Sequence, residues 1–418
     1  MCLALLLVGA PLAPTTARAD WFRVSADDVA AARRHQAQVA RAAPRPAARS
    51  LILPAAPRSA LRSVPRPVRP TAAALPAGTL IAPHEWADYK RAFLAPDGRI
   101  VDRENGGISH SEGQGYGMLL AMHAGDREAF ERMWRFTRER LQIRKDALLA
   151  WRYNPAQTPH VADRNNATDG DVLVAYALLR AAVLWGEPRY AEAADRMVAA
   201  IGRELIGTAG GRPFLKPAAF GFDRMPGNDG PVVNLSYYFY AAFALFEVVQ
   251  PAYPWAELAR EGKALTEAAR TGARNLVPNW VALARSGRVE MASGFPRRAS
   301  YDAVRIPLYM AYADLSGFDL SAHDIAWNHR GGGVPRDRDL LSDVAHGELG
   351  DPGYRMIAAL SACAARGATI PQPLLRYRTT TYFASSLHLL GLVAARQAGA
   401  CTDRLDPVVI GSRTAGVR

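Results

Sequence analysis

Apolar residues recur at intervals of three and four along most of the chain after Thr79, which is the spacing of one face of an α-helix. Most of these segments end at glycine or proline, as at Gly186 and Pro251, and only short β-branched runs interrupt them. The pattern predicts helices over residues 86–93, 117–124, 128–141, 171–185, 190–205, 235–249, 255–272, 303–315, 354–365 and 382–395.

So many helices, joined as hairpins in one unit of about 340 residues, favour either a helical solenoid or a closed ring of hairpins. No repeat of fixed length is visible, which counts against the common helical repeat arrays. We therefore predict an all-α fold, an (α/α)6 barrel of about twelve helices.

The N-terminal region differs from the rest of the chain. An apolar run over residues 3–8 and the sequence Ala17-Arg18-Ala19 predict a signal peptide over residues 1–19, truncated at its start because no Lys or Arg precedes the leucines. Residues 20–80, rich in Ala, Pro and Arg, are expected to form a disordered tether. The folded domain is predicted over residues 81–400 with a tail over 401–418, in a periplasmic or secreted protein.

The basic character of the chain belongs mainly to this tether. Residues 20–80 hold ten arginines and three aspartates, a net charge of +7 out of +12 for the whole chain. No interleaved aromatic residues or recognised module accompany them, so we expect no nucleic-acid partner. An inert linker is the favoured interpretation, and an electrostatic contact with an anionic surface is the alternative.

Three cysteines limit the redox chemistry of the chain. Cys2 falls in the predicted signal peptide, which leaves Cys363 and Cys401. Cys363 belongs to an apolar helical pattern, so we expect a buried free thiol; a disulfide with Cys401 is the alternative that export would permit. His323 and His329 are six residues apart and do not share a helix face, so no zinc site is expected.

The segment SEGQGYG at residues 111–117 is the first with a chemical signature. It places Glu112 among glycines that leave room for another group to approach the backbone closely, with the flat face of Tyr116 beside it. A carboxylic acid near an apolar surface has the raised pKa that a general acid requires. The alternative is a helix start with Glu112 near the positive end of the dipole. His110 and His123 are interpreted as structural residues.

The segment NNATDGD at residues 165–171 begins another predicted helix. Thr168 or Asp169 can cap it, and Asp171 then falls in its first turn. Two aspartates exceed what a cap needs, so we expect one of them to face a groove and bind a sugar hydroxyl.

A third segment holds Tyr301, Asp302 and Arg305. Asp302 and Arg305 are three residues apart and share a helix face. They form either an exposed ion pair or a catalytic base whose position Arg305 and Tyr301 determine.

Together, the motifs SEGQGYG, ATDGD and YDAxR, in this order, resemble glycoside hydrolase family 8 over roughly residues 80–398. The resemblance implies the (α/α)6 barrel of that family and endo-β-1,4-glucanase activity. The chain is most similar to the periplasmic endoglucanases that accompany bacterial cellulose synthase, which implies a link to cellulose synthesis. The tether has no counterpart in the family's motifs.

Carried over to this chain, the resemblance makes Glu112 the general acid and Asp302 the base, with Tyr301 and Arg305 arranging the base. It assigns Asp169 to the sugar at the cleavage point. The presence of Asp302 favours the glucanase and xylanase branch over the chitosanase branch. The family inverts configuration, which implies a separation of about 6.5–9.5 Å between the two catalytic carboxyl groups.

Sugar rings present apolar C–H faces that stack on aromatic side chains. Trp151, flanked by polar residues, is the first candidate for such a platform, and weaker candidates are Tyr116, Tyr237, Trp280 and Tyr382. We expect a monomer that binds a polysaccharide and needs no cofactor or metal. Activity on xylan, mixed-linkage glucan or chitosan, a non-catalytic glycan-binding protein and a helical scaffold remain alternatives.

Overall fold

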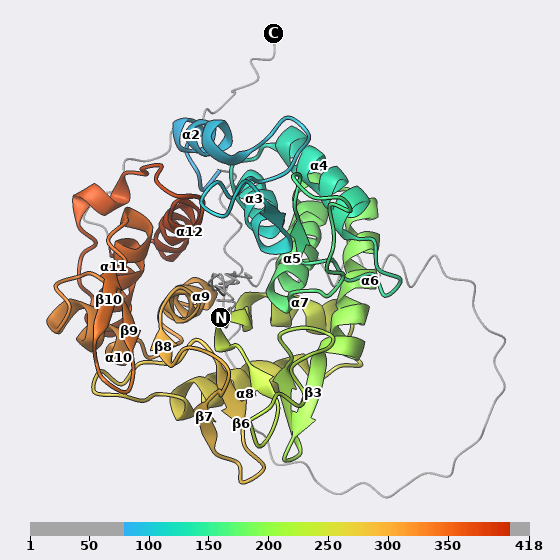
Figure 1. The fold of residues 1–418 in the computed structure, drawn as a ribbon. Coiled ribbons are helices and arrows are strands. Elements are labelled where there is room, and N and C mark those ends of the chain that lie inside the picture. Colours follow the sequence, from blue (N-terminus) through green and yellow to red (C-terminus); the bar gives the residue numbers. More distant parts are fainter. Residues whose placement is uncertain (1–78, 402–418) are drawn as a thin grey trace, which may run out of the picture.

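The helices form a closed double ring (Figure 1). The computed structural model describes residues 79–401, so the predicted signal peptide and nearly all of the predicted tether and C-terminal tail lie outside the described residues. Neighbouring helices pack side by side around the inside of the ring in the order α3 (Ser111–His123), α5 (Thr168–Trp185), α7 (Tyr240–Val249), α9 (Ile306–Ala313) and α12 (Tyr382–Ala398). Helix α12 packs against α3 and closes the ring.

The remaining helices pack against this ring. They are α2 (Pro83–Phe93), α4 (Arg127–Phe136), α6 (Pro188–Leu205), α8 (Trp255–Ala268), α10 (Ser321–Asp324) and α11 (Pro352–Arg366). Short 3-10 or π segments cover Thr137–Leu141, Leu235–Tyr237, Ala303–Arg305, Ile325–His329 and Gln372–Leu375. The eleven α-helices of residues 79–401 confirm the all-α barrel, for which about twelve helices were expected.

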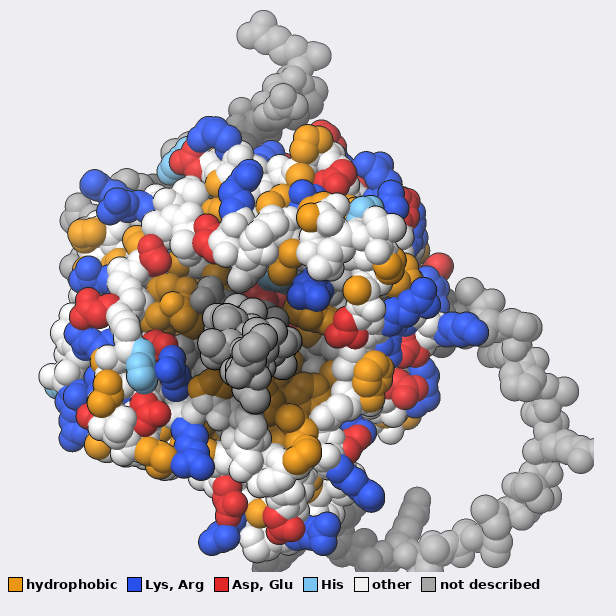
Figure 2. All heavy atoms as spheres, in the orientation of Figure 1, with side chains coloured by type: hydrophobic (Ala, Val, Ile, Leu, Met, Phe, Trp, Pro, Cys, Tyr) orange, Lys and Arg blue, Asp and Glu red, His pale blue; other side chains and the backbone are white. Residues whose placement is uncertain are grey.

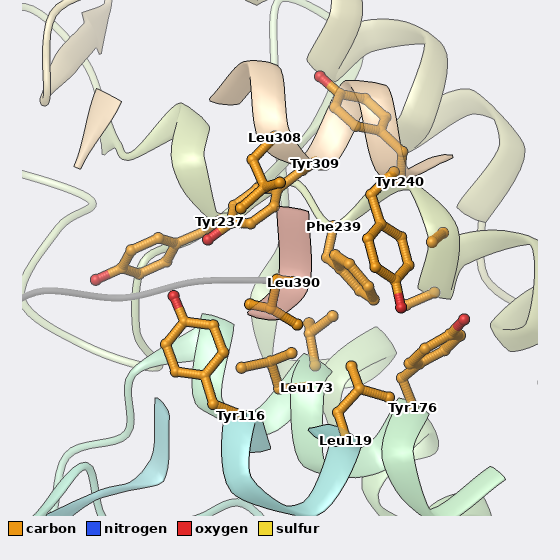
Figure 3. Close-up of a cluster of buried hydrophobic side chains, with 14 of the residues drawn as sticks. Tyr116, Leu119, Leu173, Tyr176, Tyr237, Phe239, Tyr240, Leu308, Tyr309 and Leu390 are labelled. Carbon is orange, nitrogen blue, oxygen red and sulfur yellow. The ribbon is translucent and has the colours of Figure 1, made fainter. Parts of the chain in front are cut away.

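The core lies inside the ring, where helices that are apolar on all sides face one another. All thirteen residues of α3 are buried, whereas α4 buries one face and exposes the other. Figure 3 shows Leu119 of α3, Leu173 of α5, Phe239 beside α7, Leu308 of α9 and Leu390 of α12 pointing into one cluster.

Short antiparallel strands lie between the helices along the chain. They are β1 (Ser109–His110) with β2 (Arg152–Tyr153), β3 (Ile206–Ala209) with β4 (Arg212–Leu215), β5 (Val232–Val233) with β6 (Val281–Leu283) and β7 (Val289–Met291), and β8 (Arg298–Ala299) with β9 (Arg336–Asp339) and β10 (Ala345–Glu348). These pairings position loops and not the core.

Two predicted helices are interrupted. The segment 235–249 begins with a 3-10 turn in which the Asn234 side chain accepts the Ser236 N–H, and the α-helix starts only at Tyr240. The segment 303–315 likewise begins with a 3-10 turn, and α9 starts at Ile306 with Pro307 in its first turn, where a proline costs no helical hydrogen bond.

The glycines of residues 113–117 serve helix packing. A side chain on Gly115 would overlap Leu173 of α5, and one on Gly117 would overlap Met133 and Ile100. The expected close approach to the backbone is therefore made by neighbouring side chains at Gly115 and Gly117. Their absence of a side chain lets α3 approach α5 and α4 closely.

Cys363 and Cys401 form a disulfide with their Cα atoms 5.8 Å apart, so the expectation of a buried free thiol is wrong. Gly353 at the start of α11 lies against Ala384 of α12, and Gly391 lies against Met356, so these helices run parallel. Their C-terminal ends therefore lie side by side. The prediction that successive helices form hairpins is wrong for α11 and α12, because the two helices of a hairpin run antiparallel and their C-terminal ends lie far apart.

Candidate active site

Three charged side chains meet where α5 and α9 begin. Arg305 Nη2 lies 2.6 Å from Asp302 Oδ1, and Arg305 Nη1 lies 3.9 Å from Asp169 Oδ2. All three residues are buried. The predicted pairing of Asp302 with Arg305 is confirmed, and the alternative of an exposed ion pair is wrong.

Side chains distant in sequence hold this arrangement in place. The Asn279 side-chain oxygen accepts the backbone N–H groups of Ser300 and Ala303, on either side of Asp302, at 2.8 and 3.1 Å. The Arg305 guanidinium also donates to Ser236 Oγ at 2.6 Å. Because its donors are divided among oxygen atoms fixed by the fold, Arg305 holds Asp302 in one orientation.

Glu112 lies in the first turn of α3 and is buried. The helix begins at Ser111, six residues before the predicted start, and His110 caps it by accepting the Gly113 N–H at 3.3 Å. The Tyr382 hydroxyl donates to Glu112 Oε1 at 3.2 Å. Glu112 therefore lies near the start of a helix, as the alternative interpretation of this segment predicts. It is also held by a side chain from α12.

The beginning of α5 joins Glu112 to the Arg305 cluster. A side chain on Gly170 would overlap Ser111 and come within 2.8 Å of the Glu112 backbone nitrogen, so the two helix starts touch. Asp169 is the neighbour of Gly170 and reaches Arg305. The structure therefore gathers Glu112, Asp169 and Asp302 in one region.

The two aspartates of the second motif have different environments. Burial, together with the nearby Asp302 carboxylate, raises the pKa of Asp169 well above its usual range. Asp171 accepts hydrogen bonds from the Leu149 backbone at 2.7 Å and the Asn166 side chain at 2.8 Å, so it anchors two loops. Neither Thr168 nor Asp169 is the N-cap, which is Ala167.

Aromatic and polar residues surround a cavity of about 380 Å³ beside Asp302. Trp151, Tyr237, Trp280 and Tyr301 all line it. Trp280 is stacked between Phe222 and Phe295, with ring centroids 5.4 and 4.4 Å away, so these rings cover both of its faces.

Trp151 is only partly buried. Its indole N–H donates to Asp163 at 2.8 Å, and the Arg152 guanidinium lies 4.6 Å from its ring. Tyr116 and Tyr382 lie elsewhere, buried against each other beside Glu112 with ring centroids 6.3 Å apart. Contact of any of these rings with a sugar stays a prediction.

A family model described as "Glycosyl hydrolases family 8" matches residues 69–397. The chain belongs to glycoside hydrolase family 8. This enzyme is 37% identical to an endoglucanase of Cellulomonas uda, over 74% of this chain and 85% of the relative.

Two further relatives align with similar fractions of this enzyme's sequence. It is 36% identical to a probable endoglucanase of Novacetimonas hansenii, over 77% of this chain and 93% of the relative. Among solved structures, the endo-β-1,4-glucanase of Acetobacter xylinum has 35% identity and a TM-score of 0.69, over 76% of this chain and 98% of that one.

The surface of this glycoside hydrolase mixes charges of both signs. On the face shown in Figure 2, Lys and Arg side chains alternate with Asp and Glu around the rim, and hydrophobic side chains gather toward the middle. Within residues 79–401, no helix combines the length and apolar character that crossing a membrane requires. In the same residues, no three His, Cys, Asp or Glu side chains converge as metal ligands would.

The sequence reasoning missed the residues that position the catalytic candidates. Asn279 and Ser236 form hydrogen bonds to Ala303 and Arg305 of the third motif, and Asp102 forms one to His110, which precedes the first motif. Asp102 is eight residues from His110, and the other two are more distant from their partners, so no helical spacing connects them. His123, which was interpreted as structural, is buried and pairs with Tyr312 at 2.6 Å.

Proposed function

We propose that this enzyme hydrolyses internal β-1,4 linkages of glucan, with Glu112 as general acid and Asp302 as general base. The names of the most similar relatives support the reaction class. The observation that carries the assignment of residues is the Arg305 cluster, in which a buried guanidinium lies 2.6 Å from Asp302 and favours its ionised form. An ionised carboxylate is what a base requires.

The proposed reaction is a single displacement. Glu112 gives its proton to the glycosidic oxygen as the bond from that oxygen to the anomeric carbon breaks. A water molecule forms a bond to the anomeric carbon from the opposite face and gives a proton to Asp302, so configuration inverts. Asp169, whose raised pKa favours a carboxylic acid, is proposed to hold the hydroxyl groups of the sugar at the cleavage point.

The assignment is tested with Glu112→Gln and Asp302→Asn. Each variant is expected to lower kcat on carboxymethylcellulose at least about a hundredfold, because a general acid or base typically contributes 10²–10⁴. Glu257→Gln, on the outer helix α8, is the matched control and should retain activity. Near-normal turnover by a correctly folded Glu112 or Asp302 variant removes that residue from its proposed role.

The stereochemistry of the first product separates a base from a nucleophile. Proton NMR of early products from a β-glucan should show the α-anomer, since a water molecule attacks directly. Initial release of the β-anomer would mean that Asp302 forms a covalent intermediate.

We also propose that the enzyme is exported to the periplasm or secreted, in association with cellulose synthesis. The Cys363–Cys401 disulfide supports export, because such bonds persist in oxidising compartments. Activity against cellulose, xylan, chitosan and mixed-linkage glucan should be highest on β-1,4-glucan. Higher activity on xylan or chitosan would replace the proposed substrate, and activity on none would favour a glycan-binding protein.

A further inference from the structure

His110 lies between two carboxylates. Its Nε2 is 3.2 Å from Asp102 Oδ2, and its Nδ1 is 3.6 Å from Glu112 Oε2. All three side chains are buried, and the imidazole packs against the ring of Tyr382 with centroids 5.5 Å apart.

The hydrogen bonds of the imidazole determine which nitrogen carries its proton. Nδ1 accepts the backbone N–H of Gly113 at 3.3 Å, so in the neutral ring it is the unprotonated nitrogen. Nε2 then carries the proton and donates it to Asp102. The opposite tautomer would lose both interactions.

Asp102 is itself fixed as an acceptor. Burial opposes ionisation, but hydrogen bonds from His110 and Asn105 outweigh it and hold the pKa of Asp102 below its usual value. The Asn105 amide donates to Oδ2 at 2.5 Å. An ionised Asp102 can only accept, so it holds the Nε2–H tautomer of His110 in place.

The tautomer has a consequence for Glu112. A lone pair on Nδ1 repels a carboxylate beside it and is compatible with a carboxylic acid. Tyr382 donates to Oε1, which makes Oε2, the oxygen beside Nδ1, the natural position for the acid's proton. Glu112 must be protonated whenever a new glycosidic bond enters the site.

We propose that His110, held in one tautomer by Asp102, is a positioning residue that keeps Glu112 protonated between turnovers. The inference rests on the proposed role of Glu112 as the acid. Titratable groups beside Glu112 on other elements include Tyr382 of α12 and Asp169 of α5, next to Gly170, and Glu104 accepts the Tyr382 backbone N–H. Arg305 lies beyond Asp169.

The test is the pH dependence of kcat/KM, whose basic limb reports the loss of the acid's proton. In His110→Asn the side-chain amide is not held in one orientation, so its NH2 group can turn toward Glu112 and donate to a carboxylate, which the lone pair of Nδ1 cannot do. The basic limb should move to lower pH by about 1 unit, with kcat/KM below pH 6 reduced less than about threefold. Asp102→Asn should shift the limb the same way, because its amide can donate to Nε2 and move the ring proton to Nδ1, where it stabilises a carboxylate.

His123→Asn is the matched control, being the same substitution near the other end of α3. It should lower Tm and leave the basic limb in place. If the role of His110 is only structural, His110→Asn should also lower Tm and leave the basic limb in place. An unshifted basic limb in a folded His110→Asn variant therefore overturns the inference. If His110→Asn does not fold, Asp102→Asn decides: an unshifted limb overturns the inference and a shifted one supports it.

A second substrate separates this inference from the proposed function. An aryl cello-oligosaccharide with a nitrophenol leaving group of low pKa needs little protonation, so it should be hydrolysed by His110→Asn with a nearly wild-type pH profile. An equal shift on both substrates would overturn the role of His110. Activity of Glu112→Gln on cellulose would instead overturn the assignment of Glu112 itself.

Discussion

Trp151 lines the cavity beside Asp302. Its indole N–H donates to Asp163, and the Arg152 guanidinium lies over its ring. Trp151→Ala is expected to weaken cello-oligosaccharide affinity by about 1–2 kcal/mol, because stacking of a sugar on the ring is lost. Calorimetric titration measures the affinity and a thermal scan gives Tm. Trp134→Ala, in the buried face of α4, is the control that should lower Tm instead. A Trp151 variant that behaves like the Trp134 variant would place Trp151 in the core.

Asp171 gives the folded state an unusual pH dependence. Burial raises the pKa of Asp171 to about 7 from its ordinary value of 3.8. Between these two values the folded state holds a proton that the unfolded chain has lost, so this residue's contribution to stability falls as the pH rises from about 4 to 7 and is constant above that. The slope is at most about 1.4 kcal/mol per pH unit.

Chemical denaturation of Asp171→Asn at several pH values checks this. The neutral amide cannot ionise, so the destabilisation relative to wild type should shrink by at least about 1 kcal/mol between pH 5 and pH 7. Asp126 is the control of opposite sign: burial opposes its ionisation, but Lys90 and its other hydrogen-bond partners lower its pKa. Its contribution is therefore constant between pH 7 and pH 5 and is lost only as the pH falls below about 4, through the lowered pKa of the folded state. A constant cost of Asp171→Asn across this range would contradict the prediction.

At the residue level, spacing along the chain predicts some contacts and not others. Asp302 and Arg305 are three apart, so their pairing follows from one helical turn. Asn279 and Ser236 reach the same cluster from 21 and 69 residues away, through loop and ring geometry. Nothing in the local sequence marks such partners. The three motifs therefore predict the charged residues, and only the fold identifies what positions them.

The disulfide between α11 and the residues after α12 closes a loop with a sequence separation of 38. Restricting the unfolded chain to this extent corresponds to a stabilisation of about 3–4 kcal/mol in the loop-entropy model. The double variant Cys363→Ala, Cys401→Ala should therefore unfold at lower denaturant concentration while its kcat on soluble substrate changes little, because neither cysteine lines the cavity.

Treatment of the wild type with dithiothreitol should reproduce that loss of stability, and the same treatment should leave the double variant unchanged. Equal stability of oxidised and reduced enzyme would contradict the prediction.

At the level of elements, hydrophobic spacing predicts that helices exist more reliably than it predicts their direction or ends. It located all the long helices, because each carries an apolar face over several turns. It did not show that α11 and α12 run parallel, since a linker of 367–381 can return the chain as readily as a hairpin can reverse it. Nor did it locate α10, whose four residues are too few for a period.

For the whole molecule, removal of residues 20–78 should leave the rate on soluble glucan within about twofold. The segment lies outside the described residues, and the expectation rests on its prolines and net positive charge, which give it little apolar surface to bury against the barrel. Rates and Tm of the truncated and full-length enzymes provide the measurement. A large fall in Tm would show that the segment packs on the folded domain.

The glycines of α3 have a consequence for how this enzyme can be altered. Leu173, Met133 and Tyr382 contact α3 where Gly115, Gly117 and Gly113 provide no side chain, so neighbours on three sides set the position of Glu112. The position of Glu112 therefore depends on how α3 packs against α4, α5 and α12, and a change in that packing would alter its alignment with Asp302. Engineering of substrate range therefore belongs in the strand-bearing loops, whose residues can vary without changing the radius of the barrel.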